Sequence, residues 1–219
     1  MMFNIFINPS KFSKFTDIIF KPLMLISLIV VIVGLILVYL SPLDYQQGLT
    51  VQIMYIHVPS AWLALLTYAI MTIYSIIGLA FKTPFSFVIN KAIAPIGAVF
   101  TLLCLISGSM WGKPMWGTWW VWDARLTSVA ILFIVYLLII FLNQTFENRD
   151  VREKTIAIFI LIGSINLPII KFSVDWWNTL HQPASVSKLS SPSIAVSYTH
   201  HRAHETDSYL VCRLLLEKK

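Results

Sequence analysis

Long apolar runs separated by short polar segments dominate the pattern of this chain. Five of the runs are long enough, or nearly so, for the roughly 20 residues that a helix needs to cross a lipid bilayer. The pattern therefore predicts an all-α integral membrane protein, a polytopic helical bundle with five spans. Pro168 is expected to kink or end the last of them. The predicted spans are Leu23–Leu40, Val58–Phe81, Ala92–Met110, Ala124–Leu142 and Thr155–Ile170.

Composition supports this class. Of the 219 residues, 58% are hydrophobic and only 12% are charged, about half of the roughly 25% that is usual in globular proteins. So much apolar surface excludes a water-soluble domain, and it is the opposite of the bias that produces disorder. The two cysteines, Cys104 and Cys212, are too few for a disulfide framework, a cysteine-based zinc site or a CxxC redox motif.

The lysines and arginines predict the orientation of the spans, because cytoplasmic loops carry an excess of these residues. An N-terminal segment 1–22 on the cytoplasmic side makes the distribution eight inside and four outside. The net charge of +6 then reflects membrane topology, and no nucleic-acid partner is expected. The inner residues are Lys11, Lys14, Lys21, Lys82, Lys91, Arg149, Arg152 and Lys154, and the outer ones are Lys113, Arg125, Lys171 and Lys188.

A tryptophan-rich stretch, 111–125, falls on the predicted outer face. It holds five of the eight tryptophans of the chain: Trp111, Trp116, Trp119, Trp120 and Trp122. One interpretation is an aromatic belt that anchors helix ends at the level of the lipid headgroups. The other is a platform for a large planar ligand, which Gly112 and Gly117 would let approach the backbone closely. If the chain is helical from Trp116 onward, the residues on one face are Trp116, Trp119, Trp120 and Asp123, and Trp122 points elsewhere.

Two histidines flank this stretch on the same predicted face. His57 is expected at the end of the loop that precedes the second span, two residues before Pro59. His181 follows a pair of tryptophans. Each alone is typical of a polar residue at a helix end, but they are the only histidines among the first 195 residues. Two neutral imidazoles beside an aromatic slot suit six-coordinate haem iron. Zinc would require four ligands, and the sequence offers no cysteine or carboxylate cluster to complete such a site.

Charged residues at the start of the fourth span admit two interpretations. Asp123 and Arg125 can form a charge pair at a helix end. Alternatively Arg125, with Lys113, neutralises a haem propionate. In that case Asp123 orients an imidazole or accepts indole N–H bonds within the loop.

Three motifs carry a family resemblance. WGKPMWGTWWVWDARLTS (111–128) resembles the WWD signature of the haem-handling membrane proteins of cytochrome c biogenesis. MYIHVPSAW (54–62) and WWNTLHQ (176–182) resemble the two histidine motifs of one branch, the cytochrome c maturation protein C family. The resemblance covers about residues 20–195. It implies a haem-handling membrane domain, 23–195, with an external loop at 111–128. The membrane that the resemblance implies first is the inner membrane of a bacterium, and the alternative is that of a mitochondrion.

The resemblance also implies the site and its partners. His57 and His181 would be the axial iron ligands of non-covalent haem b on the periplasmic face. The surrounding platform would be Trp111, Trp116, Trp119, Trp120, Trp122, Asp123 and Arg125. Haem would be delivered to the periplasmic haem chaperone, cytochrome c maturation protein E (CcmE). Further partners would be the small membrane protein CcmD and the ABC transporter complex CcmA/CcmB.

Haem binding and transfer without catalysis is the leading functional hypothesis. Three alternatives stay open: a haem lyase, a haem transporter, and a bis-histidine electron-transfer subunit of the membrane. The haem-handling hypothesis predicts that alanine at Trp119 or Trp120 lowers haem occupancy or transfer.

The segment 196–219 departs from the family. It is polar and charged where members carry a sixth span, and its sequence is typical of a non-native, translated adapter tail. We therefore expect that the sixth span is missing and that His200, His201 and His204 form no metal site.

Overall fold

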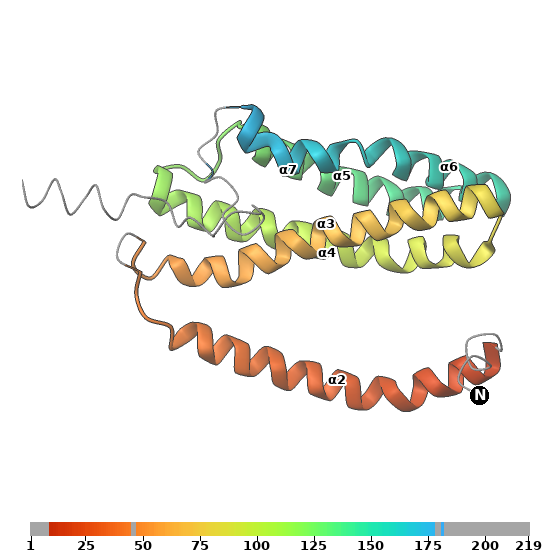
Figure 1. Ribbon diagram of the computed structural model, residues 1–219, viewed down its shortest axis with the longest axis horizontal. Coiled ribbons are helices and arrows are strands. Elements are labelled where there is room, and N and C mark those ends of the chain that lie inside the picture. Colours follow the sequence, from red (N-terminus) through yellow and green to blue (C-terminus); the bar gives the residue numbers. More distant parts are fainter. Residues whose placement is uncertain (1–8, 45–46, 178–180, 182–219) are drawn as a thin grey trace, which may run out of the picture.

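The computed structural model describes residues 9–44, 47–177 and 181, with side chains described from Lys14 onward (Figure 1). The predicted non-native tail, 196–219, and Cys212 within it lie outside these residues, as does the C-terminal end of the predicted haem-handling domain. The described chain is helical, and five helical segments are long and apolar enough to cross a membrane. The predicted class, a polytopic helical membrane protein with five spans, is confirmed. The helices are α2 Pro9–Tyr39, α3 Val51–Phe81, α4 Pro84–Trp116, α5 Ala124–Thr145, α6 Arg149–Gly163 and α7 Asn166–Trp176.

The helices extend well beyond the apolar runs that predicted them. α3 begins at Val51, so His57 lies in the second turn of the helix, and its expected place in a loop before the span is wrong. The reason is that helical hydrogen bonds join backbone groups, so polar residues at the end of a span do not interrupt them. The extension brings the His57 side chain onto a rigid helix.

The fifth span is divided into α6 and α7, but the break precedes Pro168. The turn falls at Ser164 and Ile165, whose N–H groups bond to Ile160, Leu161 and Ile162 carbonyls. α7 then starts at Asn166 with Pro168 in its first turn, where a proline loses no hydrogen bond. The expected kink is therefore present, one turn before Pro168, whereas the expectation that the helix stops at this residue is wrong, because α7 continues to Trp176.

Helices α3 to α7 form one bundle, and α2 runs alongside it with little contact (Figure 1). α3 and α4 form an antiparallel pair, joined only by Lys82 and Thr83. The apolar side chains of α2 are exposed along its length, as expected for a helix that faces lipid. The bundle end where α3 starts and α4 ends carries the tryptophan-rich stretch.

Two buried tyrosines fix the middle of the bundle. Tyr68 on α3 and Tyr136 on α5 pack edge to face with ring centroids 5.3 Å apart. Tyr136 donates to the Ala64 carbonyl at 2.8 Å, and Tyr68 donates to the Ile160 carbonyl at 3.1 Å. These two bonds tie α3 to α5 and to α6 and hold the helices in register.

Glycine at position 97 makes room for one of these tyrosines. A Cβ atom there would overlap the Tyr136 ring, so we expect Gly97→Ala to lower the free energy of unfolding by about 1–3 kcal/mol. Thermal unfolding in detergent measures the effect. Gly34→Ala on α2 is the matched control, because a Cβ atom at that position meets no atom within 4 Å. Equal melting temperatures for the two variants would contradict this account of the core.

Candidate functional site: a cavity lined by histidines and tryptophans

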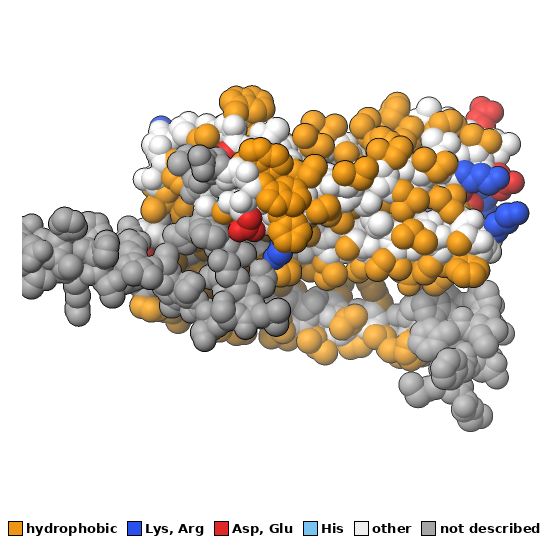
Figure 2. Space-filling view, turned by 45° about the horizontal axis from the view of Figure 1, so that its top comes forward, with side chains coloured by type: hydrophobic (Ala, Val, Ile, Leu, Met, Phe, Trp, Pro, Cys, Tyr) orange, Lys and Arg blue, Asp and Glu red, His pale blue; other side chains and the backbone are white. Residues whose placement is uncertain are grey.

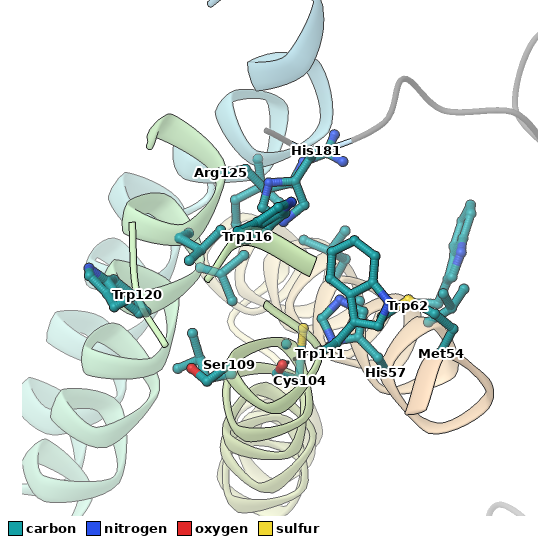
Figure 3. A pocket seen from close by; sticks show the side chains of 18 of the residues that line it. Met54, His57, Trp62, Cys104, Ser109, Trp111, Trp116, Trp120, Arg125 and His181 are labelled. Atoms are coloured by element: carbon teal, nitrogen blue, oxygen red, sulfur yellow. Dashed lines mark hydrogen bonds between the residues drawn. The ribbon is translucent and has the colours of Figure 1, made fainter. Parts of the chain in front are cut away.

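A cavity of about 430 Å³ opens at the end of the bundle where α3 begins and α4 ends (Figure 3). Its volume is within the range of small-molecule and cofactor sites, roughly 300–1,000 Å³. α3, α4, α5 and α7 all contribute to its wall, together with the loop after α4. Its aromatic, imidazole and cationic side chains are Trp62, Trp111, Trp116, Trp120, His57, His181, Arg125 and Lys171.

His57 is held by α4. Its Nδ1 lies 3.0 Å from the Cys104 carbonyl oxygen and 3.1 Å from Ser107 Oγ. A carbonyl only accepts hydrogen bonds, so Nδ1 carries the proton and the lone pair of the neutral ring is on Nε2. Gly108 provides the space, because a Cβ atom there would be 3.0 Å from His57 Cε1.

His181 is held by the loop before α5. Its Nδ1 lies 3.0 Å from Asp123 Oδ2, and its ring packs edge to face on Trp116 with centroids 5.0 Å apart. Asp123 is only 8% exposed, and its Oδ1 accepts from the Leu126 N–H at 2.7 Å as the N-cap of α5. The Asp123–imidazole contact considered from the sequence is present.

Burial lowers the pKa of His181, and the hydrogen bond and charge of Asp123, which raise it, do not compensate fully. His181 is therefore neutral at pH 7, with its proton on the nitrogen that faces Asp123. His57 and His181 thus share one pattern: the protein holds Nδ1, and Nε2 carries the lone pair that a metal ion requires.

The tryptophans divide into two groups. Trp111, Trp116 and Trp120 line the cavity; Trp111 donates to Gln47 Oε1 at 2.9 Å and packs edge to face on Trp116. Trp119 and Trp122 are 58% and 81% exposed and lie outside the lining. Trp122 contacts the edge of Trp120, with centroids 5.6 Å apart.

The chain is not helical from Trp116 onward, so the predicted helical face of tryptophans does not form. α4 ends at Trp116, and Gly117 adopts a left-handed conformation with φ of 79°, donating its N–H to the Lys113 carbonyl. Residues 117–123 are therefore not helical, and Trp119 does not share a face with Trp116. Gly112, interpreted as a point of approach for a flat ligand, is instead buried beneath Trp116.

The cations of the cavity also differ from the expected pair. Arg125 lines it, and its Nε donates to Ser173 Oγ at 3.3 Å. Lys113 is not among the lining residues; its Nζ donates to the Gly117 carbonyl at 3.1 Å. The second cation is Lys171 of α7, whose Nζ lies 5.3 Å from the centroid of the Trp62 ring.

Sequence reasoning missed Lys171, Trp62 and Gly108. The sequence does contain a signal for Lys171, since it is a charged residue directly after the predicted span Thr155–Ile170, ten positions before His181. Trp62 is the last residue of the motif 54–62, which also contains His57. Gly108 lies one helical turn before Gly112, and this spacing is typical of a helix that another group approaches closely.

The donor set fits an iron porphyrin better than a bare metal ion. Over residues 9–44, 47–177 and 181, no three His, Cys, Asp or Glu side chains cluster in a way that could hold a metal. The cavity does offer two imidazoles, aromatic walls and two cations. Imidazoles can ligate the iron of a flat metal complex, and cations can pair with its carboxylates. Fold and site together define a multi-pass helical membrane protein with a bis-histidine cavity at one membrane face.

Comparison with known proteins agrees with this class. The family model of Heme exporter protein C (CcmC) matches residues 2–204. Heme exporter protein C of Bradyrhizobium diazoefficiens is 49% identical over 191 residues, which are 87% of this chain and 73% of that protein. The chain belongs to the Heme exporter protein C family, whose members handle haem in cytochrome c biogenesis.

Other relatives match over a shorter part. A putative cytochrome c biosynthesis ccmC-like mitochondrial protein of Marchantia polymorpha is 51% identical over 160 residues, 73% of this chain and 67% of that protein. Heme exporter protein C of Escherichia coli K12 is 51% identical over 142 residues, 65% of this chain and 58% of that protein. The chain thus spans between about three fifths and three quarters of the length of these relatives.

Proposed function

We propose that the cavity holds haem b non-covalently, with His57 and His181 as the two axial iron ligands. The observation that carries the proposal is that these histidines, 124 residues apart in sequence, line one cavity and each present Nε2 through the same protonation pattern. A neutral imidazole whose Nδ1–H is bonded to a carbonyl or carboxylate is the usual form of an iron-ligating histidine. The tryptophans supply flat apolar walls for the macrocycle.

The charged groups support the same ligand. Arg125 and Lys171 both line the cavity and would pair with the two propionates of haem. The indole Nε1 of Trp120 is buried and has no acceptor within the described part of the chain. A buried donor of this kind is costly unless something accepts from it, and a ligand carboxylate would do so.

We further propose that the site faces the periplasm of a bacterial inner membrane and that haem passes from it to the chaperone CcmE. The lysine and arginine distribution supports this orientation. Trp119 and Trp122 are exposed beside the cavity wall, where an incoming protein could contact them. CcmD and the CcmA/CcmB complex are the further partners that the family relationship suggests.

On this proposal the chain binds and transfers haem without catalysing a reaction. In the cavity, the histidines would coordinate the ligand, the tryptophans would stack on it, and the cations would neutralise its charge. The names of the bacterial relatives describe an exporter. Whether transfer includes help in attaching haem covalently to the chaperone is decided by following that bond in a reconstituted mixture of the two proteins.

Haem titration of the full chain in detergent tests the proposal. We expect stoichiometric binding with the low-spin spectrum of six-coordinate, bis-histidine iron. A high-spin spectrum, or binding no stronger than to empty micelles, would contradict it.

Matched tryptophan variants sharpen this test. Trp120→Ala removes a cavity wall and should weaken haem binding about tenfold, since one aromatic contact contributes up to about 1.5 kcal/mol. Trp119→Ala and Trp122→Ala should leave the haem affinity within about twofold and slow only the transfer to the chaperone. Unchanged affinity in all three variants would support the membrane anchor instead, and equal loss in all three would contradict the division into lining and exposed tryptophans.

A further inference from the structure

A second cavity, of about 250 Å³, lies at the opposite end of the bundle, where α4 and α6 begin. Lys91 of α4 and Arg149 and Arg152 of α6 line it, together with the amides of Asn90 and Asn143. Figure 2 shows Lys and Arg side chains gathered with Asp and Glu at this end. The haem cavity proposed above does not involve any of these residues.

The charges of this cavity do not balance. Its only carboxylate, among the described residues that line it, is Glu153, which accepts from Arg149 Nε at 2.7 Å. Lys91 and Arg152 add two further positive charges, and Arg152 Nη1 is positioned by a 3.3 Å hydrogen bond to the Phe146 carbonyl. The lining therefore carries an excess of two positive charges within one small space.

One side of the cavity is apolar and one side is polar. Phe87 and Val88 form the apolar side, and Val88 is 56% exposed on a membrane-spanning helix, which places it toward lipid. On the inner side Asn90 is buried, and its Nδ2 donates to Ser75 Oγ at 2.9 Å. Its Oδ1 has no partner in residues 9–44, 47–177 and 181. A buried amide in a membrane helix is expensive and commonly marks a polar site.

We propose that this cavity binds the phosphodiester headgroup of an anionic membrane phospholipid. Arginine matches phosphate oxygens in pairs, and lysine adds a point charge. Basic pockets between helices at a membrane interface bind acidic headgroups by the same chemistry. The exposed apolar side gives the acyl chains a path along α4, which a free phosphate ion would not use. In the orientation proposed above, the lipid belongs to the cytoplasmic leaflet.

Native mass spectrometry and thermal unfolding of the full chain in detergent test the proposal. We expect phosphatidylglycerol to bind and to raise the melting temperature, and phosphatidylcholine to do neither. Inorganic phosphate at millimolar concentration should also have little effect. Equal stabilisation by phosphatidylglycerol and phosphatidylcholine, or by inorganic phosphate alone, would overturn the assignment to an anionic lipid.

Charge variants locate the binding. Lys91→Gln and Arg152→Gln, singly and together, should weaken phosphatidylglycerol binding, the double variant at least about fivefold. Lys82→Gln and Lys154→Gln remove the same number of charges from the same end without altering the lining residues, and should bind as the wild type does. Equal weakening by both pairs would overturn the site. If the double variant does not fold, the single variants and the wild-type lipid comparison decide the question.

Discussion

Replacement of either His57 or His181 by alanine is expected to abolish the six-coordinate spectrum of bound haem. Each variant removes one axial ligand, so the iron becomes five-coordinate and high-spin, or the haem is lost during purification. The measurement is the visible spectrum of the full chain in detergent, with haem content per protein. Added imidazole should restore a low-spin spectrum in a variant that keeps haem, because the cavity left by the side chain admits the free ligand.

Two controls separate this effect from a loss of folding. His200→Ala makes the same change in the C-terminal tail and should leave the spectrum unchanged. The melting temperature of the protein without haem should stay near that of the wild type for His181→Ala, whereas His57→Ala also removes bonds to α4. If both single variants retain the wild-type spectrum, the axial assignment is wrong.

The spans were predictable because hydropathy acts over a whole run of residues. Three of the five apolar runs lie entirely within single helices, Leu23–Leu40 ends one residue beyond α2, and Thr155–Ile170 is divided between α6 and α7. Helix ends were less predictable, because they depend on local hydrogen bonds that tolerate polar side chains. His57 shows the difference: the apolar run that begins at Val58 left it at the end of the preceding loop, yet α3 starts six residues before His57.

Part of the site was predictable and part was not. The histidines and Asp123 lie in motifs that the sequence displays, and the structure brings them to one place. The contact between Lys171 and Trp62 could not be predicted from the sequence, because it depends on the tertiary position of α7, which packs on α5. The prediction that Trp119 shares a helical face with Trp116 was wrong for a local reason. Gly117 ends α4 in a left-handed backbone conformation, which helical spacing alone does not predict.

Asp123 is expected to be the residue outside the iron ligands on which haem affinity depends most. Its carboxylate does two things: Oδ1 caps α5 through Leu126, and Oδ2 holds the His181 ring. Asp123→Ala should lower the free energy of unfolding by about 1 kcal/mol through the lost cap. It should also weaken haem binding roughly 10- to 100-fold, as is usual when the partner of a metal-ligating histidine is removed.

Asp123→Asn is the matched variant, because asparagine caps helices as well as aspartate and still accepts a hydrogen bond from Nδ1. It should keep the stability of the wild type and lose only part of the haem affinity. The two roles separate in a double-mutant cycle with His181→Ala. If Asp123 acts through the imidazole, adding Asp123→Ala to His181→Ala lowers the melting temperature but costs no further haem affinity. An equal loss of affinity with and without His181 would instead mean that Asp123 supports the cavity by shaping residues 117–123.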